Sequence, residues 1–123
     1  DKKLPYFINI GLTASYKNDE TQLLKIIKQI ESKIGRNKST KNDPRVCDID
    51  IIDFNSAIIN KKNLQIPHDK SHLRNFVLYP ILQIDSEWVH PVFKKNVKFL
   101  INKLDHKSRI EITRLNKNVI IKS

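Results

Sequence analysis

The stretch "DPRVCDIDIIDF", residues 43–54, places two aspartates two positions apart in a run that otherwise has the composition of a buried β-strand. Successive side chains of a strand point to opposite faces of its sheet. One face would therefore be apolar and packed on helices, with Cys47, Ile49 and Ile51. The other face carries Asp48 and Asp50, whose β-carbons would lie about 7 Å apart. We expect this strand to begin just after Pro44.

Two carboxylates on one rigid face are suited to bind one or two hard divalent cations, with water and phosphate oxygens completing the coordination. Alternatively, the pair is exposed on a solvated sheet face and balanced by lysines. The neighbouring residues favour phosphate chemistry, because Arg45 precedes the pair and His68, His72 and Arg74 follow it. No G-x-x-x-x-G-K-[ST] motif occurs and the chain has only two glycines, which excludes a P-loop.

The remaining patterns predict an α+β fold with a mainly antiparallel sheet. A strand is expected at 7–14 and an amphipathic helix from Asp19-Glu20-Thr21 to Gly35, with an apolar stripe of Leu23, Leu24, Ile26, Ile27, Ile30 and Ile34. A polar loop over 36–43 leads into the strand after Pro44. Beyond the turn at 54–56 we expect a hairpin of 57–59 with 64–66, helices at 76–83 and 96–104, and a closing hairpin that the tail, 109–123, forms around 116–118.

Composition limits the function classes. The chain has 123 residues, enough for one domain, and no apolar run approaches the roughly 20 residues needed to span a bilayer. Its single cysteine, Cys47, excludes an internal disulfide and favours a reducing cytoplasm, and a zinc site is not expected. The net charge of +10 favours an acidic partner such as nucleic acid, anionic lipid or polyphosphate, although scattered lysines are also typical of a solvated surface.

The motif "DPRVCDIDIIDF", followed by "LQIPHDKSHLRNFVLYPILQI" and then by "HP", resembles the signature of the 6-hydroxymethyl-7,8-dihydropterin pyrophosphokinase family. "FIN" at 7–9 and "QIESKIGR" at 29–36 extend the resemblance, which covers about residues 5 to 104. It implies a single domain over 1–123 with a ferredoxin-like sandwich. It also implies transfer of pyrophosphate from ATP to the hydroxymethyl group of the pterin, with release of AMP, in folate biosynthesis.

The resemblance implies roles residue by residue. Asp48 and Asp50 match the ligands of two magnesium ions, and Arg45, His68 and Arg74 match phosphate contacts. Arg36 and Lys38 fall in the matching catalytic loop, and Glu31 matches a nucleotide-binding position. Phe7 and Phe76 match the aromatic pair that stacks on the pterin, and Asn9 matches the amide that binds its edge. Ordinary structural alternatives remain, with Phe76 in a core, Phe7 in a strand and Asn9 as a strand-end cap. His72, His90 and His106 are interpreted as surface or structural residues, and Trp88 as a packing residue rather than a ligand contact.

The chain departs from the family at its beginning. Members have a strand, a helix and a second strand before the "FIN" segment, and the sequence lacks methionine, so we expect a fragment or a shortened relative whose sheet is N-terminally incomplete. We therefore expect marginal stability unless a further segment or a second chain completes the sheet. A relative that binds nucleotide or pterin without turnover is an alternative, as is a basic nucleic-acid-binding module suggested by charge alone.

Overall fold

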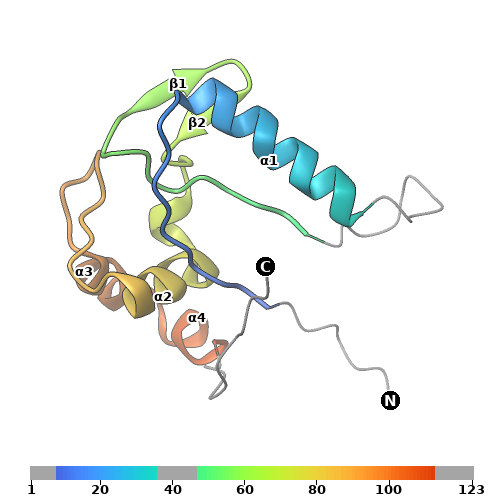
Figure 1. The fold of residues 1–123 in the computed structure, drawn as a ribbon. Helices are drawn as coiled ribbons and strands as arrows, with labels where there is room; N and C mark the ends of the chain where they lie inside the picture. The colour runs from blue at the N-terminus through green and yellow to red at the C-terminus, as the bar shows by residue number, and fades with distance from the viewer. Residues whose placement is uncertain (1–7, 36–46, 113–123) are drawn as a thin grey trace, which may run out of the picture. The chain divides into compact units, whose positions relative to one another are not determined.

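The computed structural model describes residues 8–35 and 47–112 (Figure 1). The chain divides into two compact units, one formed by Thr13–His68 and the other by Asp1–Leu12 together with Asp69–Ser123. We call the first the helix–hairpin unit and the second the helical unit. Helices and a small antiparallel sheet occur together, which is compatible with an α+β fold. None of the helices among the described residues is long and apolar enough to cross a membrane.

The long helix of the helix–hairpin unit confirms both of its predicted ends. Helix α1 spans Glu20–Ile34, and the side chain of Asp19 accepts a hydrogen bond from the backbone N–H of Gln22 at 2.9 Å. This side chain satisfies one of the N–H groups that a helix leaves without a partner in its first turn. Gly35 ends the helix and donates its N–H to the carbonyl of Glu31 at 3.0 Å. The helix therefore follows from signals that lie within or next to it.

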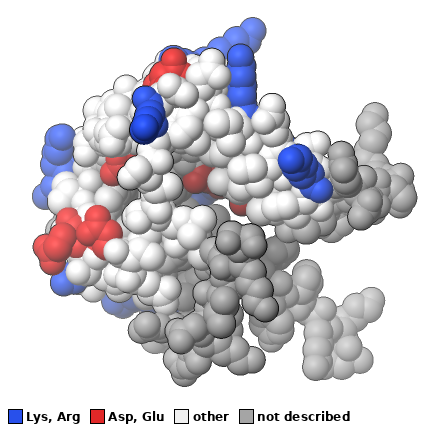
Figure 2. Space-filling model, in the orientation of Figure 1, with Lys and Arg blue, Asp and Glu red and all other residues white. Residues whose placement is uncertain are grey.

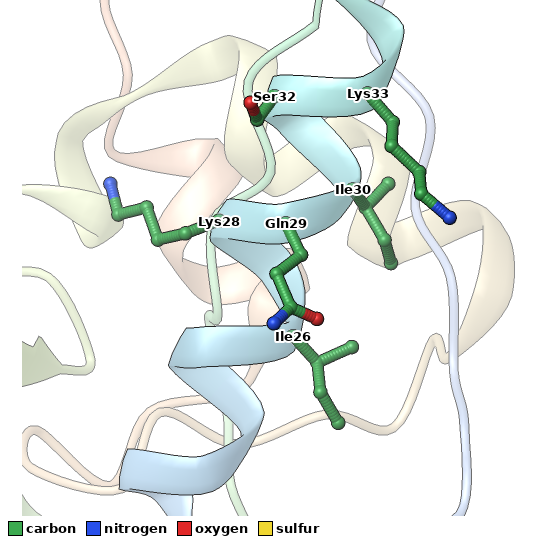
Figure 3. Close-up of a pocket in the computed structure, with 6 residues that line it drawn as sticks. All are labelled: Ile26, Lys28, Gln29, Ile30, Ser32 and Lys33. Carbon is green, nitrogen blue, oxygen red and sulfur yellow. The ribbon is translucent and has the colours of Figure 1, made fainter.

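The predicted apolar stripe of α1 is only partly packed. Ile27 is buried and Leu23 and Leu24 are half-buried, whereas Ile26 and Ile30 are exposed. Figure 3 shows Ile26 and Ile30 projecting from the same side of the helix, along an open depression. The residues lining that depression all come from α1 itself, namely Ile26, Lys28, Gln29, Ile30, Ser32 and Lys33. One side of the helix therefore packs within its unit, and the neighbouring apolar edge faces outward.

A two-stranded antiparallel sheet completes the helix–hairpin unit. Strand β1, Ile59–Lys61, pairs with β2, Leu64–Ile66, so that Asn60 lies opposite Gln65. The predicted hairpin is confirmed, with its first strand beginning two residues later than expected. Lys61 donates to the carboxylate of Glu20 and, at 3.1 Å, to the hydroxyl of Thr21, which ties β1 to the first turn of α1.

The predicted turn after the acidic segment is also confirmed. Asn55 and Ser56 have φ of 53° and 62°, and the N–H of Ala57 donates to the carbonyl of Phe54 at 2.9 Å. Positive φ at both central residues is the geometry of a tight turn that short polar residues tolerate. The carboxylate of Asp53 accepts the N–H of Ser56 at 2.8 Å, and this hydrogen bond stabilises the turn where the chain enters it.

Four short helices lie among the described residues of the helical unit. These are the 3₁₀ helix η1, Ser71–Leu73, and the α-helices α2, Asn75–Ile84, α3, Val97–Asn102, and α4, His106–Ile110. Helices α2 and α3 pack on one another around buried apolar side chains, which include Leu78, Ile81, Trp88, Val97, Leu100, Ile101 and Leu104. This confirms the predicted helices at 76–83 and 96–104 and the structural role of Trp88. Asn96 caps α3 by accepting the N–H of Lys98 at 2.7 Å.

The segment of the helical unit that precedes Thr13 lies against α2. A β-carbon built on Gly11 would stand 3.0 Å from Cδ1 of Ile84 and 3.1 Å from the backbone oxygen of Pro80. Such contacts are unusually tight, so a side chain at this position would require its neighbours to shift by a few tenths of an ångström, and the oxygen belongs to the helix backbone, which moves less readily than a side chain. Pro80 lies inside α2 and offers no N–H to the helix at that point.

Buried polar side chains of the helical unit include Ser71 and His90. Nδ1 of His90 accepts the N–H groups of Val92 and Phe93 at 3.1 and 3.2 Å, and Nε2 lies 3.5 Å from the hydroxyl of Ser71. Because Nδ1 accepts, the ring proton of neutral His90 belongs on Nε2, where it faces Ser71. The interpretation of His90 as structural is therefore confirmed.

Three sequence-based predictions of strands are wrong for the described residues. Residues 8–14 and 47–53 lie in no strand, since no neighbouring segment among the described residues pairs with either of them. Arg109 and Ile110 end helix α4 where a strand was expected, because Asp105 caps that helix by accepting the N–H of Ser108 at 2.8 Å. The described residues contain one two-stranded sheet, and the predicted turn at 116–118 lies outside them.

Candidate functional site

The acidic segment of residues 47–53 runs alongside α1 within the helix–hairpin unit (Figure 1). Asp48 and Asp50 are exposed, whereas Cys47, Ile49 and Ile51 are half-buried. This alternation is the one predicted from the sequence, although no ladder of backbone hydrogen bonds supports it here. The two carboxylates therefore face solvent while their apolar neighbours are partly covered.

A side-chain hydrogen bond joins the acidic segment to α1. Oε2 of Glu31 accepts the backbone N–H of Ile49 at 2.7 Å. The side chain of Glu31 is only 10% exposed, and its other oxygen lies 3.9 Å from Nζ of Lys28. Glu31 was expected on the nucleotide side of the site, and the structure places its carboxylate on the backbone between the two candidate metal ligands.

The donor chemistry of the acidic pair fits magnesium. Among the described residues no group of three or more His, Cys, Asp or Glu side chains is arranged to hold a metal ion. Magnesium keeps several waters and is usually held by one or two carboxylates together with substrate phosphates, so a larger cluster is not required. Asp48 and Asp50 supply oxygen ligands of this kind and are open to solvent.

His68, a predicted phosphate contact, follows the hairpin of the same unit. Ile66 and Pro67 before it are buried and joined by a cis peptide bond, and His68 itself is exposed. The buried pair fixes the exit of the chain from β2, so that the imidazole stands on the surface. His68 is therefore accessible to a ligand.

The helical unit brings together two further predicted residues. Arg74 stands immediately before α2, and its guanidinium carbon lies 5.6 Å from the centre of the Phe76 ring. Phe76 is 43% exposed, which makes the ordinary reading of a core phenylalanine wrong. A guanidinium over a ring keeps its in-plane N–H groups available for other acceptors. Arg74 is therefore still able to donate to an anion.

Asn9, the predicted pterin-edge amide, is exposed in the segment that Gly11 fixes against α2. Its unit is the one that contains Phe76. Four other predicted site residues lie outside the described residues: Phe7, Arg36, Lys38 and Arg45. The described candidates thus divide between the units, with Glu31, Asp48, Asp50 and His68 in one and Asn9, Arg74 and Phe76 in the other.

Sequence reasoning missed two structural participants. The backbone N–H of Ile49 was not considered, since a pattern of side chains carries no signal for a main-chain donor. Ser71, the buried partner of His90, was also missed, although the quoted motif includes it together with the "HP" dipeptide at 90–91.

Comparison with known proteins shows the family to which the chain belongs. The family model described as 7,8-dihydro-6-hydroxymethylpterin-pyrophosphokinase matches residues 2–86. The chain therefore belongs to this family, as its sequence motif indicated.

Individual relatives agree with this assignment. The chain is 36% identical over 92 residues to the 2-amino-4-hydroxy-6-hydroxymethyldihydropteridine pyrophosphokinase of Aquifex aeolicus, covering 75% of this chain and 58% of the relative. It is 34% identical over 101 residues to the protein of the same name from Synechocystis, covering 82% and 52%. It is 44% identical over 85 residues to the folic acid synthesis protein FOL1 of Dictyostelium discoideum, covering 69% and 13%. The chain thus matches about half the length of the two pyrophosphokinases and a small part of FOL1.

Proposed function

We propose that this chain transfers pyrophosphate from ATP to 6-hydroxymethyl-7,8-dihydropterin and releases AMP, as a step of folate biosynthesis. Membership of the pyrophosphokinase family supports the reaction. The observation that carries the proposal to this chain is the exposure of both motif carboxylates, Asp48 and Asp50, beside half-buried apolar neighbours. Exposed carboxylates can be reached by cations that bind together with a triphosphate.

The acidic pair has the central role in the proposed reaction. Asp48 and Asp50 would hold two magnesium ions, which when bound neutralise charge on the phosphates. His68 and Arg74 would donate to phosphate oxygens, and an imidazole and a guanidinium both do this well. We propose that the phosphates are also contacted by Arg36, Lys38 and Arg45. Of these, Arg36 and Arg45 would stabilise charge as AMP leaves.

The helical unit would supply contacts to the pterin. Phe76 exposes part of its ring, and a flat heterocycle stacks well on such a surface. Asn9 is exposed and carries both a donor and an acceptor for the polar edge of the pterin. Phe7 is proposed as the second aromatic partner of the stack.

We further propose that residues 1–123 form one pyrophosphokinase-like domain with the ferredoxin-like sandwich that the resemblance implies. The family match over residues 2–86 supports this, because it includes parts of both compact units. The single cysteine, Cys47, is free, which favours a reducing compartment, and we propose the cytoplasm.

The test is AMP release from ATP in the presence of magnesium and the hydroxymethyl pterin, comparing three isosteric variants. Asp48→Asn and Asp50→Asn should each lower the rate by about 100-fold or more, which corresponds to about 2.7 kcal/mol in the barrier. Asp53→Asn is the matched control, because it removes the same charge from the same segment while its amide oxygen still accepts the N–H of Ser56. Unchanged rates in the first two variants would contradict the proposal.

Two other results would select the alternatives. Calorimetry that detects binding of ATP, with no AMP released by the wild-type chain, would favour a relative that binds without turnover. Binding to nucleic acid with affinity falling steeply with salt would favour the basic module. Figure 2 shows Lys and Arg side chains at several places on the drawn face, some of them close together at its top.

A further inference from the structure

Glu31 occupies a place where the helix pattern calls for an apolar side chain. It follows Ile27 by four residues and Leu24 by seven, so it lies on the side of α1 that packs within the helix–hairpin unit. Its side chain is 10% exposed. Burying a carboxylate is unfavourable unless it is well hydrogen-bonded, so its position calls for an explanation in the contacts it makes.

One hydrogen bond of Glu31 is made across a long sequence separation. Oε2 accepts the N–H of Ile49 at 2.7 Å, over 18 positions along the chain. Hydrogen bonds from a backbone N–H to an ionised carboxylate are shorter and stronger than those between neutral groups. Glu31 therefore fastens the chain at Ile49 to α1 with a directional bond.

The fastened residue is the one between the two acids. Asp48 and Asp50 share a peptide unit each with Ile49, so the direction of both side chains depends on how the backbone at Ile49 is held. Residues 47–53 belong to no strand among the described residues. No other described segment pairs with it through a ladder of backbone hydrogen bonds, and the side chain of Glu31 supplies a fixed point.

We propose that Glu31 is a positioning residue for the metal site. It holds the backbone between Asp48 and Asp50 against α1 and thereby fixes the geometry in which the two carboxylates bind Mg²⁺. This proposal rests on the proposed function, in which those carboxylates are the metal ligands. It differs from the role implied by the family resemblance, in which Glu31 belongs to the nucleotide contacts. Residues that orient metal ligands typically contribute about 10–100-fold to metal affinity.

The length of the Glu31 side chain and its charge can be changed separately, and this distinguishes a positioning role from a role in nucleotide binding. Glu31→Gln keeps the length of the side chain and an oxygen that accepts the N–H of Ile49, but it loses the charge. Glu31→Asp keeps the charge but is shorter by one methylene, so its oxygen no longer reaches Ile49 at the same place. A positioning role requires reach, whereas a role through charge on the nucleotide or its metal requires the carboxylate. Gln29→Ala, an exposed position of the same helix, is the matched control.

The experiment measures binding of α,β-methylene-ATP to the full chain as a function of Mg²⁺ concentration. In Glu31→Asp we expect the Mg²⁺ concentration for half-maximal binding to rise about 10–100-fold, with affinity for the analogue at saturating Mg²⁺ within about threefold of wild type. Glu31→Gln and Gln29→Ala should stay within about threefold of wild type throughout. Circular dichroism at the assay temperature checks that each variant is folded.

Two results would overturn the positioning role of Glu31, and a third would overturn the proposed function on which it rests. If Glu31→Gln loses affinity for the analogue even at saturating Mg²⁺ while Glu31→Asp does not, Glu31 acts through its charge on the nucleotide. If neither variant changes the Mg²⁺ dependence while Asp48→Asn and Asp50→Asn abolish it, the metal site stands and only the positioning role fails. If Asp48→Asn and Asp50→Asn leave the Mg²⁺ dependence intact, the proposed function itself fails.

Discussion

At the scale of single residues, His90 shows how a polar side chain organises its surroundings from inside a core. Its ring is nearly inaccessible, and Nδ1 accepts the N–H groups of Val92 and Phe93. Its own carbonyl accepts the N–H of Lys94, which has a φ of 58°, at 2.8 Å. One residue thus satisfies three backbone donors of a turn. Hydrogen bonds of this kind explain why a histidine and not an aliphatic residue stands there.

Substitution of His90 tests this account. In His90→Asn the side-chain oxygen still accepts nearby N–H groups, as asparagine does in turns, and the loss of stability should stay near 1 kcal/mol. In His90→Leu the two N–H groups lose their acceptor, and we expect a loss of about 2–4 kcal/mol. Urea unfolding followed by fluorescence of Trp88, whose ring centroid lies 5.7 Å from that of His90, measures both. Equal stability of the two variants would show that the acceptor is unimportant.

Acid sensitivity is expected at the cap of α4. The hydrogen bond from the backbone N–H of Ser108 holds the pKa of Asp105 below its usual value of 3.8, and the nearby Lys107 and Arg109 act in the same direction. Because the pKa is lower in the folded state, this contribution to stability is present above about pH 3.8 and is lost as the pH falls through the folded-state value.

The variant Asp105→Asn isolates that contribution, since asparagine also caps helices but does not titrate. We expect its melting temperature to fall less steeply than that of wild type between about pH 4.5 and pH 2.5. Glu20 retains its own acid sensitivity in both proteins, because its hydrogen bond with Lys61 lowers its pKa. Parallel pH profiles for the two proteins would argue against a role for the Asp105 charge.

At the scale of elements, the long helix and the short hairpin were predictable, whereas the strands expected at 8–14 and 47–53 were not found. Helix α1 carries its N-cap, Asp19, and its terminating glycine, Gly35, in the adjacent sequence, so local signals suffice. A strand forms only when another segment of the chain pairs with it, and the sequence of the strand does not identify that segment. The alternation of 47–51 therefore gave the exposure of Asp48 and Asp50 correctly and the strand incorrectly.

The candidate site also combines features that local sequence predicts with contacts that it does not predict. Exposure of the acids and of His68 follows from local pattern, whereas the bond from Ile49 to Glu31 joins residues 18 positions apart. Nothing in the spacing of either segment indicates that contact. The predicted roles of Arg74 and Phe76 came from the resemblance, and their mutual contact came only from the structure.

Close packing of the segment before Thr13 on α2 provides a test at this scale. Gly11→Val would force side-chain atoms toward the backbone oxygen of Pro80, and we expect a loss of about 1–3 kcal/mol in urea unfolding. Leu12→Val is the control, because Leu12 is exposed and no crowding is expected there. Adding Ile84→Ala to Gly11→Val should recover only part of the loss, since it relieves Ile84 and not the helix backbone. Full recovery would place the conflict at Ile84 alone.

At the scale of the whole molecule, the exposed apolar side chains are the main basis for what we expect of its stability and association. Among the described residues, six large aliphatic side chains are more than half exposed: Ile8, Ile10, Leu12, Ile58, Leu73 and Ile110. Exposed apolar groups contribute nothing to folding through burial, and when they gather they mark surfaces where other segments or partners bind.

We therefore predict that the isolated chain is marginally stable. Calorimetry should show a broad transition at low temperature, and a hydrophobic dye should bind before the transition. The same exposed side chains should make the melting temperature depend on protein concentration if copies associate. A sharp, cooperative transition above about 65 °C, beyond the usual range of such domains, would count against this prediction.

The bond between Glu31 and Ile49 also has a kinetic consequence. An amide hydrogen that is held by a buried carboxylate exchanges with deuterium only when that contact opens. The Ile49 amide therefore records how often the acidic segment leaves α1, in a protein that holds neither substrate. Its exchange rate measures how firmly the two acids are preorganised before any ligand arrives.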